Sequence, residues 1–260
     1  MNPRRMPMTE GGRWFVQGWR LFTLDLEMWL ILTLAWFVAI LALHLIPKIG
    51  VLIILILTPA FYAGFIYGAK EVDQGRDLKF RHIFQGLIDN NKRLPLLLLG
   101  LTATLIGLVL MALGVDLGGD LSGLNVRSDR PPVARGSGAV SPIIVFITQA
   151  AFFAFLSNLV FIYACPLVMF TNAKPFVALR SSLIACLDNV RPLLLFSLIY
   201  FGLGLFASIL VGLPFLIVFP VTFCALYASY KSIYEHTPAQ PIQDSTPRPQ
   251  KRRKTRARSR

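Results

Sequence analysis

The chain has 260 residues, of which 55% are hydrophobic and only 15% are charged, and its mean hydropathy is +0.62. Soluble domains use about 25% charged residues, whereas the apolar residues here gather in long runs without Asp, Glu, Lys or Arg. This composition excludes a soluble globular protein, a secreted disulfide scaffold and a disordered chain. We therefore expect an all-α, polytopic membrane helix bundle, with a formal net charge of +13.

Six apolar segments are long enough to cross a bilayer, which takes about 20 residues of helix. The last uncharged run contains Gly212-Leu213-Pro214, and Gly with Pro marks a turn that divides this run into two spans. Such runs must be helical in lipid, because backbone groups without a hydrogen-bond partner cannot face hydrocarbon. Within a membrane domain of residues 1–235, the expected spans are residues 28–47, 49–69, 94–115, 143–171, 192–210 and 213–230.

Lys and Arg are distributed very unequally between the segments that flank these spans. The N-terminal segment, the second and fourth connections and the C-terminal tail hold 22 of them, and the other connections hold four. Because cytoplasmic segments carry the excess of positive charge, we expect both termini to lie in the cytoplasm.

A short amphipathic stretch precedes each pair of spans, at about residues 12–26, 78–90 and 175–190. Apolar side chains recur there at helical spacings of three and four. A helix with one apolar stripe, aromatic residues and basic flanks is typical of the membrane interface. The three stripes are Phe15, Trp19, Phe22 and Leu26; Phe80, Ile83, Phe84, Leu87 and Ile88; and Phe176, Leu179, Leu183, Leu187 and Val190.

The junctions between these stretches and the spans repeat in sequence. Residues 87–98 read LIDNNKRLPLLL and residues 186–195 read CLDNVRPLLL, so we expect Asn90 and Asn189 to end the interfacial helices in the left-handed conformation. The second span of each pair also contains one internal proline. We interpret the chain as three tandem units, each an interfacial helix followed by a transmembrane hairpin. Kinks are expected at Pro59, Pro166 and Pro220, as inherited packing geometry or, alternatively, for gating.

Small residues recur at every fourth position in two of the spans. This spacing lets helix backbones approach closely, and we expect it to serve internal packing, with a dimer face as the alternative. The oligomeric state stays open. The two stripes are Ala60, Gly64 and Gly68, and Gly204, Ser208 and Gly212.

The sequence contains no HExxH, GxSxG, Walker A or strand-associated GxGxxG motif. Its three cysteines, Cys165, Cys186 and Cys224, have no partner at CxxC spacing. We therefore expect no catalytic, cofactor or metal site, and no enzymatic activity.

Residues 236–260 are expected to form a disordered, basic cytoplasmic tail, because they are rich in Pro, Gln, Ser and Thr. Contact with anionic lipid head groups is the favoured role of its last ten residues. Nucleic acid is less favoured, because no aromatic residues interleave to stack on bases. The basic side chains are Lys251, Arg252, Arg253, Lys254, Arg256, Arg258 and Arg260.

Three short motifs, together with the basic tail, carry a family resemblance. They are Gly18-Trp19-Arg20-Leu21-Phe22, Leu57-Thr58-Pro59-Ala60 and the segment Glu71–Asp77. Over about residues 12–235 the chain resembles an uncharacterised family of six-span inner-membrane proteins from beta-proteobacteria. The resemblance implies a bacterial inner-membrane location and brings no catalytic residue, substrate or cofactor.

The function expected from the sequence is that of a non-enzymatic accessory, scaffolding or lipid-organising protein. Its expected partners are the lipid bilayer and its anionic head groups, and a membrane protein partner stays open. The rival hypothesis is a small transporter or channel for an apolar or lipid-like substrate. A flux assay separates the two, because a scaffold gives no protein-dependent flux.

Overall fold

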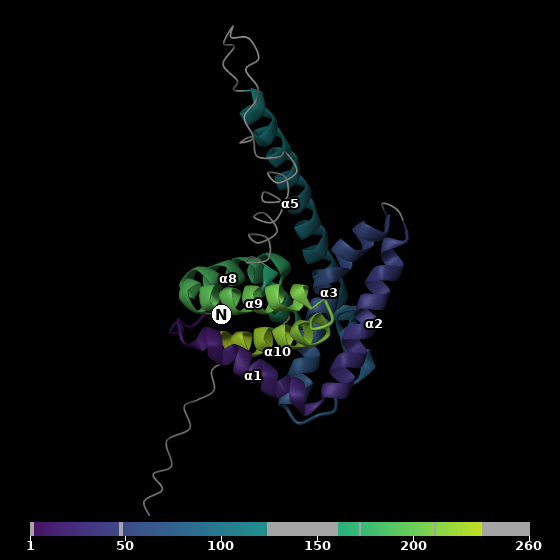
Figure 1. The fold of residues 1–260 in the computed structure, drawn as a ribbon, viewed down its shortest axis with the longest axis vertical. Coiled ribbons are helices and arrows are strands. Elements are labelled where there is room, and N and C mark those ends of the chain that lie inside the picture. The colour runs from purple at the N-terminus through teal and green to yellow at the C-terminus, as the bar shows by residue number, and fades with distance from the viewer. Residues whose placement is uncertain (1–2, 47–48, 124–160, 172, 211, 236–260) are drawn as a thin grey trace, which may run out of the picture.

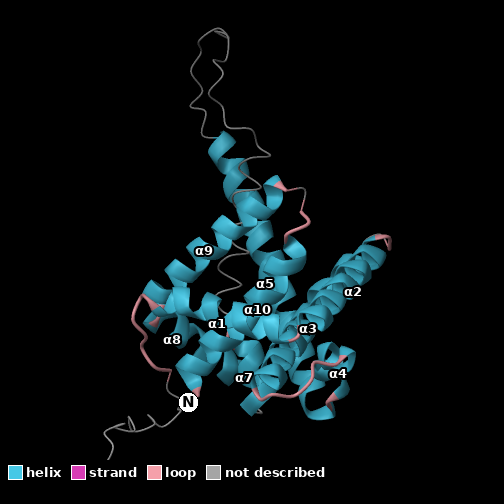
Figure 2. Cartoon of the chain, turned by 60° about the horizontal axis from the view of Figure 1, so that its bottom comes forward, coloured by secondary structure: helices cyan, strands magenta, loops and turns pink. Residues whose placement is uncertain are grey.

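The computed structural model describes residues 3–46, 49–123, 161–171, 173–210 and 212–235, and in these residues all regular secondary structure is helical (Figures 1 and 2). The prediction of an all-α protein is confirmed for this part of the chain. The helices are α1 (Glu10–Leu24), α2 (Leu26–His44), α3 (Ile49–Asp73), the 3-10 helix η1 (Phe80–Phe84), α4 (Gln85–Ile88), α5 (Asn90–Gly123), α7 (Ala164–Thr171), α8 (Pro175–Asp188), α9 (Val190–Ile209) and α10 (Phe215–Tyr234).

Among the described residues, five helices are long and apolar enough to cross a membrane: α2, α3, the first 20 residues of α5, α9 and α10. They coincide with five of the expected spans and make this a multi-pass membrane protein. The other expected span, residues 143–171, is described only from residue 161 onward and there contains α7. The predicted turn separates α9 from α10, where Gly212 adopts a φ of +81° that favours glycine.

Helix α10 lies at the centre of the described helices. It packs against α1, α2, α3 and α9. In its most apolar stretch of 18 residues, 67% is buried, whereas the corresponding share is 22–39% in the other candidate spans. In Figure 1, α2 and α5 run up the view, whereas α8, α9 and α10 run across it. The helices of spanning length are therefore not all parallel, and the hairpin of α9 and α10 crosses the others.

The first expected interfacial stretch, residues 12–26, covers most of α1, and its expected apolar stripe is divided between buried and exposed positions. Phe15 and Phe22 are buried, whereas Trp19 is 52% and Leu26 is 44% exposed. The buried side instead centres on Trp14, which is fully inaccessible and donates its indole N–H to the Ser232 hydroxyl of α10 at 2.9 Å. The stripe read from apolar spacing is therefore rotated relative to the packed side.

The second expected interfacial helix is wrong as a single element. Residues 78–90 form η1 and the single turn α4, after which Asp89 leaves the helical conformation and α5 begins at Asn90. The expected left-handed asparagines are also wrong, because Asn90 is helical and Asn189 has a φ of −119°. The glycines with a positive φ among the described residues are Gly75 and Gly212.

Candidate functional site

The three helices that contain Pro59, Pro166 and Pro220 each receive one of the short segments that precede the spans. The segment η1–α4 packs on α3, which contains Pro59, and α8 packs on α7, which contains Pro166. Helix α1 packs on α10, which contains Pro220. In two of these pairs the docked segment follows the helix directly in the chain, whereas in the third the first helix returns to the last. The same kind of contact therefore occurs three times, and the third one joins the first helix of the chain to the last.

The first small stripe faces mainly η1–α4 and the residues before it, and at Gly68 it also approaches Trp29 of α2. A Cβ added at Gly64 would lie 2.0 Å from the carbonyl oxygen of Ile83, and one at Gly86 would lie 2.7 Å from the carbonyl oxygen of Ala60. At Gly68 it would meet the side chain of Leu78 at 2.8 Å. Gly64 and Gly86 thus allow the backbones of α3 and η1–α4 to touch, and Gly68 leaves room for the Leu78 side chain.

The second small stripe has different surroundings. An added Cβ at Gly204 would have no neighbouring atom within 4 Å, Ser208 is exposed, and Gly212 belongs to the turn before α10. In the part of the chain that the structure describes, no helix backbone packs on this stripe. Helix α1, in contrast, uses a glycine for docking, because a Cβ at Gly18 would lie 2.6 Å from the backbone nitrogen of Ala225.

The proline of α7 leaves a carbonyl group that a neighbouring helix satisfies. Pro166 has no N–H to donate to the carbonyl oxygen of Ile162, four residues earlier. The hydroxyl of Tyr62 in α3 donates to that oxygen instead, at 2.7 Å. The N–H of the next residue, Tyr163, donates to the Ser182 hydroxyl of α8 at 3.1 Å. Side chains from α3 and α8 therefore hold the chain directly before α7.

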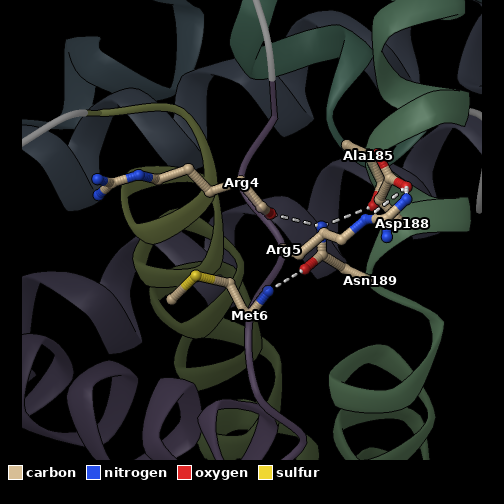
Figure 3. Close-up of polar contacts among 6 residues, drawn as sticks. All are labelled: Arg4, Arg5, Met6, Ala185, Asp188 and Asn189. Atoms are coloured by element: carbon tan, nitrogen blue, oxygen red, sulfur yellow. Dashed lines mark hydrogen bonds and ion pairs between the residues drawn. The ribbon is translucent and has the colours of Figure 1, made fainter.

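The junction of α8 and α9 binds the N-terminal segment, as Figure 3 shows. Asn189 is completely buried, and its side-chain oxygen accepts a hydrogen bond of 2.7 Å from the backbone N–H of Met6. Its side-chain nitrogen donates to the carbonyl oxygens of Arg4 and Ala185, at 2.9 Å each. Two of the three hydrogen bonds of this buried amide therefore hold residues 4–6 in place, and the third holds it to its own helix (Figure 3).

Polar contacts join the segments that the charge distribution assigns to one side of the membrane. The Asp25 carboxylate, between α1 and α2, accepts the backbone N–H of Leu78 at 3.0 Å. The Asp73 carboxylate, at the end of α3, accepts the ammonium group of Lys231 at 2.5 Å. The guanidinium group of Arg5 pairs with Asp188 at 2.8 Å. The N-terminal segment, the connection after α3, the junction before α9 and the end of α10 thus meet at one polar junction.

Helix α8 has two sides of different character. Four of the five residues in its expected apolar stripe are exposed, by 79% at Phe176, 43% at Leu183, 66% at Leu187 and 44% at Val190. The opposite side is buried and consists of small residues, namely Ala178, Ser182, Ala185 and Cys186. The apolar stripe therefore faces away from the protein.

The imidazole of His82 lies at the foot of the α3–η1 contact. The residue is 8% exposed, and its Nδ1 accepts the backbone N–H of Lys79 at 3.2 Å. Burial lowers the pKa of His82 below its ordinary value of 6.5, against the opposing attraction of Glu71. The neutral imidazole is therefore the form that this contact uses.

The three cysteines are buried thiols. Burial raises the pKa of the Cys186 thiol to about 12, which keeps it protonated and unreactive at neutral pH. Among the described residues no group of three His, Cys, Asp or Glu side chains could hold a metal ion. The basic residues between Lys251 and Arg260 lie outside the described residues, as does the whole tail from residue 236.

Comparison with protein-family models, with curated proteins and with solved structures found no match for this chain.

Proposed function

We propose that this chain is a non-enzymatic, multi-pass inner-membrane protein that organises lipids of the cytoplasmic leaflet, with both termini in the cytoplasm. In this proposal six spans form three tandem units. Each interfacial segment docks on the proline-containing span of the neighbouring unit, and α1 closes the ring on α10. The basic tail adds a second contact with anionic head groups.

The observation that carries the proposal is the outward apolar stripe of α8. Exposed apolar area costs about 25 cal/mol per Å² in water, so a row containing Phe176, Leu183 and Leu187 needs an apolar cover. Lys174, Arg180 and Arg191, on or beside the same helix, are exposed as well. An apolar stripe with basic neighbours fits the boundary between acyl chains and anionic head groups, where long basic side chains reach the phosphates.

Depth-dependent fluorescence quenching tests this arrangement. Leu187→Cys places one thiol on the apolar stripe of α8, and Asp77→Cys places one in the exposed connection after α3, while the native cysteines are buried. After labelling and reconstitution into vesicles containing phosphatidylglycerol, nitroxide lipids should quench the label at position 187 strongly and that at position 77 weakly. Equal, water-like accessibility at both positions would overturn the proposal.

The same vesicles address the rival transporter. Protein-dependent flux of an apolar or lipid-like probe would favour the rival, whereas a lipid organiser gives none. Native mass spectrometry after gentle extraction tests whether the protein is an accessory subunit. Such a subunit would leave the membrane in stoichiometric complex with another protein.

A further inference from the structure

A cavity of about 500 Å³ lies between the N-terminal segment, α1, the end of α3 and the end of α10. Its walls carry three cations, Arg4, Arg20 and Lys231, and two carboxylates, Asp73 and Glu235. The cavity lies at the polar junction where α1 closes on α10. None of its described lining residues belongs to the α8 stripe.

The charges in this cavity are unevenly satisfied. The Asp73 carboxylate accepts both the Lys231 ammonium group, at 2.5 Å, and the Tyr227 hydroxyl, at 2.9 Å, and so neutralises the lysine. In the part of the chain that the structure describes, the guanidinium groups of Arg4 and Arg20 have neither an ion-pair partner nor a hydrogen-bond acceptor. The walls therefore carry a net positive charge with two guanidinium groups available.

Both arginines are attached to fixed backbone. The Arg4 N–H donates to the carbonyl oxygen of Ile233 at 3.1 Å, and its carbonyl oxygen accepts the amide of Asn189 at 2.9 Å. Arg20 belongs to α1, which the close approach of Gly18 holds against α10. Little backbone ordering is therefore left for a ligand to impose, which favours binding.

We propose that this cavity binds the phosphate group of an anionic phospholipid, with Arg4 and Arg20 as the phosphate-binding residues. Guanidinium groups match phosphate oxygens through paired, charge-assisted hydrogen bonds. Leu21 and Leu24 line the same cavity and supply apolar surface for the glycerol backbone. The inference deepens the proposed lipid-organising function and rests on it, because it assigns that function one stoichiometric head-group site.

The test measures ligand-induced stabilisation of the full chain in a nonionic detergent. Short-chain phosphatidylglycerol should raise the unfolding temperature, whereas short-chain phosphatidylcholine and inorganic phosphate should have little effect. Arg4→Gln and Arg20→Gln should each weaken phosphatidylglycerol binding about tenfold, since a charge-assisted hydrogen bond contributes at least this much. Arg81→Gln removes an exposed arginine outside the cavity and should bind as the wild type does.

Wild-type affinity in both cavity variants would overturn the inference, and it would leave the quenching result for α8 standing. Equal stabilisation by inorganic phosphate would overturn the lipid as the source and assign the cavity to a free phosphate compound. Arg20→Gln keeps the test decisive if Arg4→Gln misfolds, because Arg20 lies on the exposed side of α1. Co-elution of the variants with the wild type on gel filtration is the folding control.

Discussion

Replacement of Gly64 by alanine tests the close packing of α3 on η1. The added Cβ would lie 2.0 Å from the oxygen and 2.6 Å from the carbon of the Ile83 carbonyl group, both of them backbone atoms. Ordinary contact needs about 3.4 Å, so η1 would have to move by more than 1 Å. Overpacking of this kind costs about 1–3 kcal/mol. Alanine regains about 0.5–1 kcal/mol by its higher helix propensity, so we expect a net loss of about 1–2 kcal/mol.

Gly204→Ala is the matched control for this substitution. Gly204 is also an interior glycine of a candidate span, but an added Cβ there meets no atom within 4 Å. Only the propensity gain remains, and this variant should be equally or more stable than the wild type. Thermal unfolding in mild detergent measures both, with the two unfolding temperatures expected to move in opposite directions. A Gly64→Ala protein as stable as the wild type would refute the reasoning.

Three further predictions use other parts of the molecule. Tyr62→Phe leaves the Ile162 carbonyl without a donor and should cost about 1–3 kcal/mol in unfolding experiments, whereas the exposed Tyr200→Phe should change little. Because burial lowers the pKa of His82, the unfolded chain binds more protons than the folded chain between this lowered pKa and the ordinary value of 6.5. The wild type should therefore lose stability as the pH falls through this range, and His82→Gln should show a smaller loss. A reporter active only outside the cytoplasm should give signal when fused after residue 128 and none after residue 240; signal at 240 contradicts the proposed topology.

The features of the fold that depend on the length of an apolar run and on local backbone chemistry were predicted well. Long uncharged runs fix α2, α3, α5, α9 and α10, because only a helix satisfies the backbone of such a run in lipid. The Gly212–Pro214 turn was also predictable, since glycine tolerates positive φ and proline begins a helix readily. These inferences do not require knowing which side of a helix packs against the protein.

The inward and outward sides of the short helices were not predictable from apolar spacing. In water the apolar stripe faces the protein, whereas next to lipid both sides can be apolar and small residues mark the packed side. Helix α8 follows the second rule, with Ala178 and Ala185 inside and Phe176 and Leu187 outside. Helix α1 follows both rules at once, because the large apolar Trp14 and the small Gly18 both face α10. A search for small residues at helical spacing in these stretches would have found both packed sides.

Asn189 shows why a correct motif gave an incorrect local prediction. The Asp-Asn pairs at residues 89–90 and 188–189 repeat in sequence, and a helix-ending asparagine was the simplest local explanation. Two of its three hydrogen-bond partners, Met6 and Arg4, lie more than 180 residues away, and no local rule can predict them. The corresponding Asn90 is exposed and helical, so the same pair does different work at the two junctions. The difference arises because the chain has only one N-terminal segment, which can occupy only one of the two junctions. It occupies the junction beside α10, because α1 docks on α10.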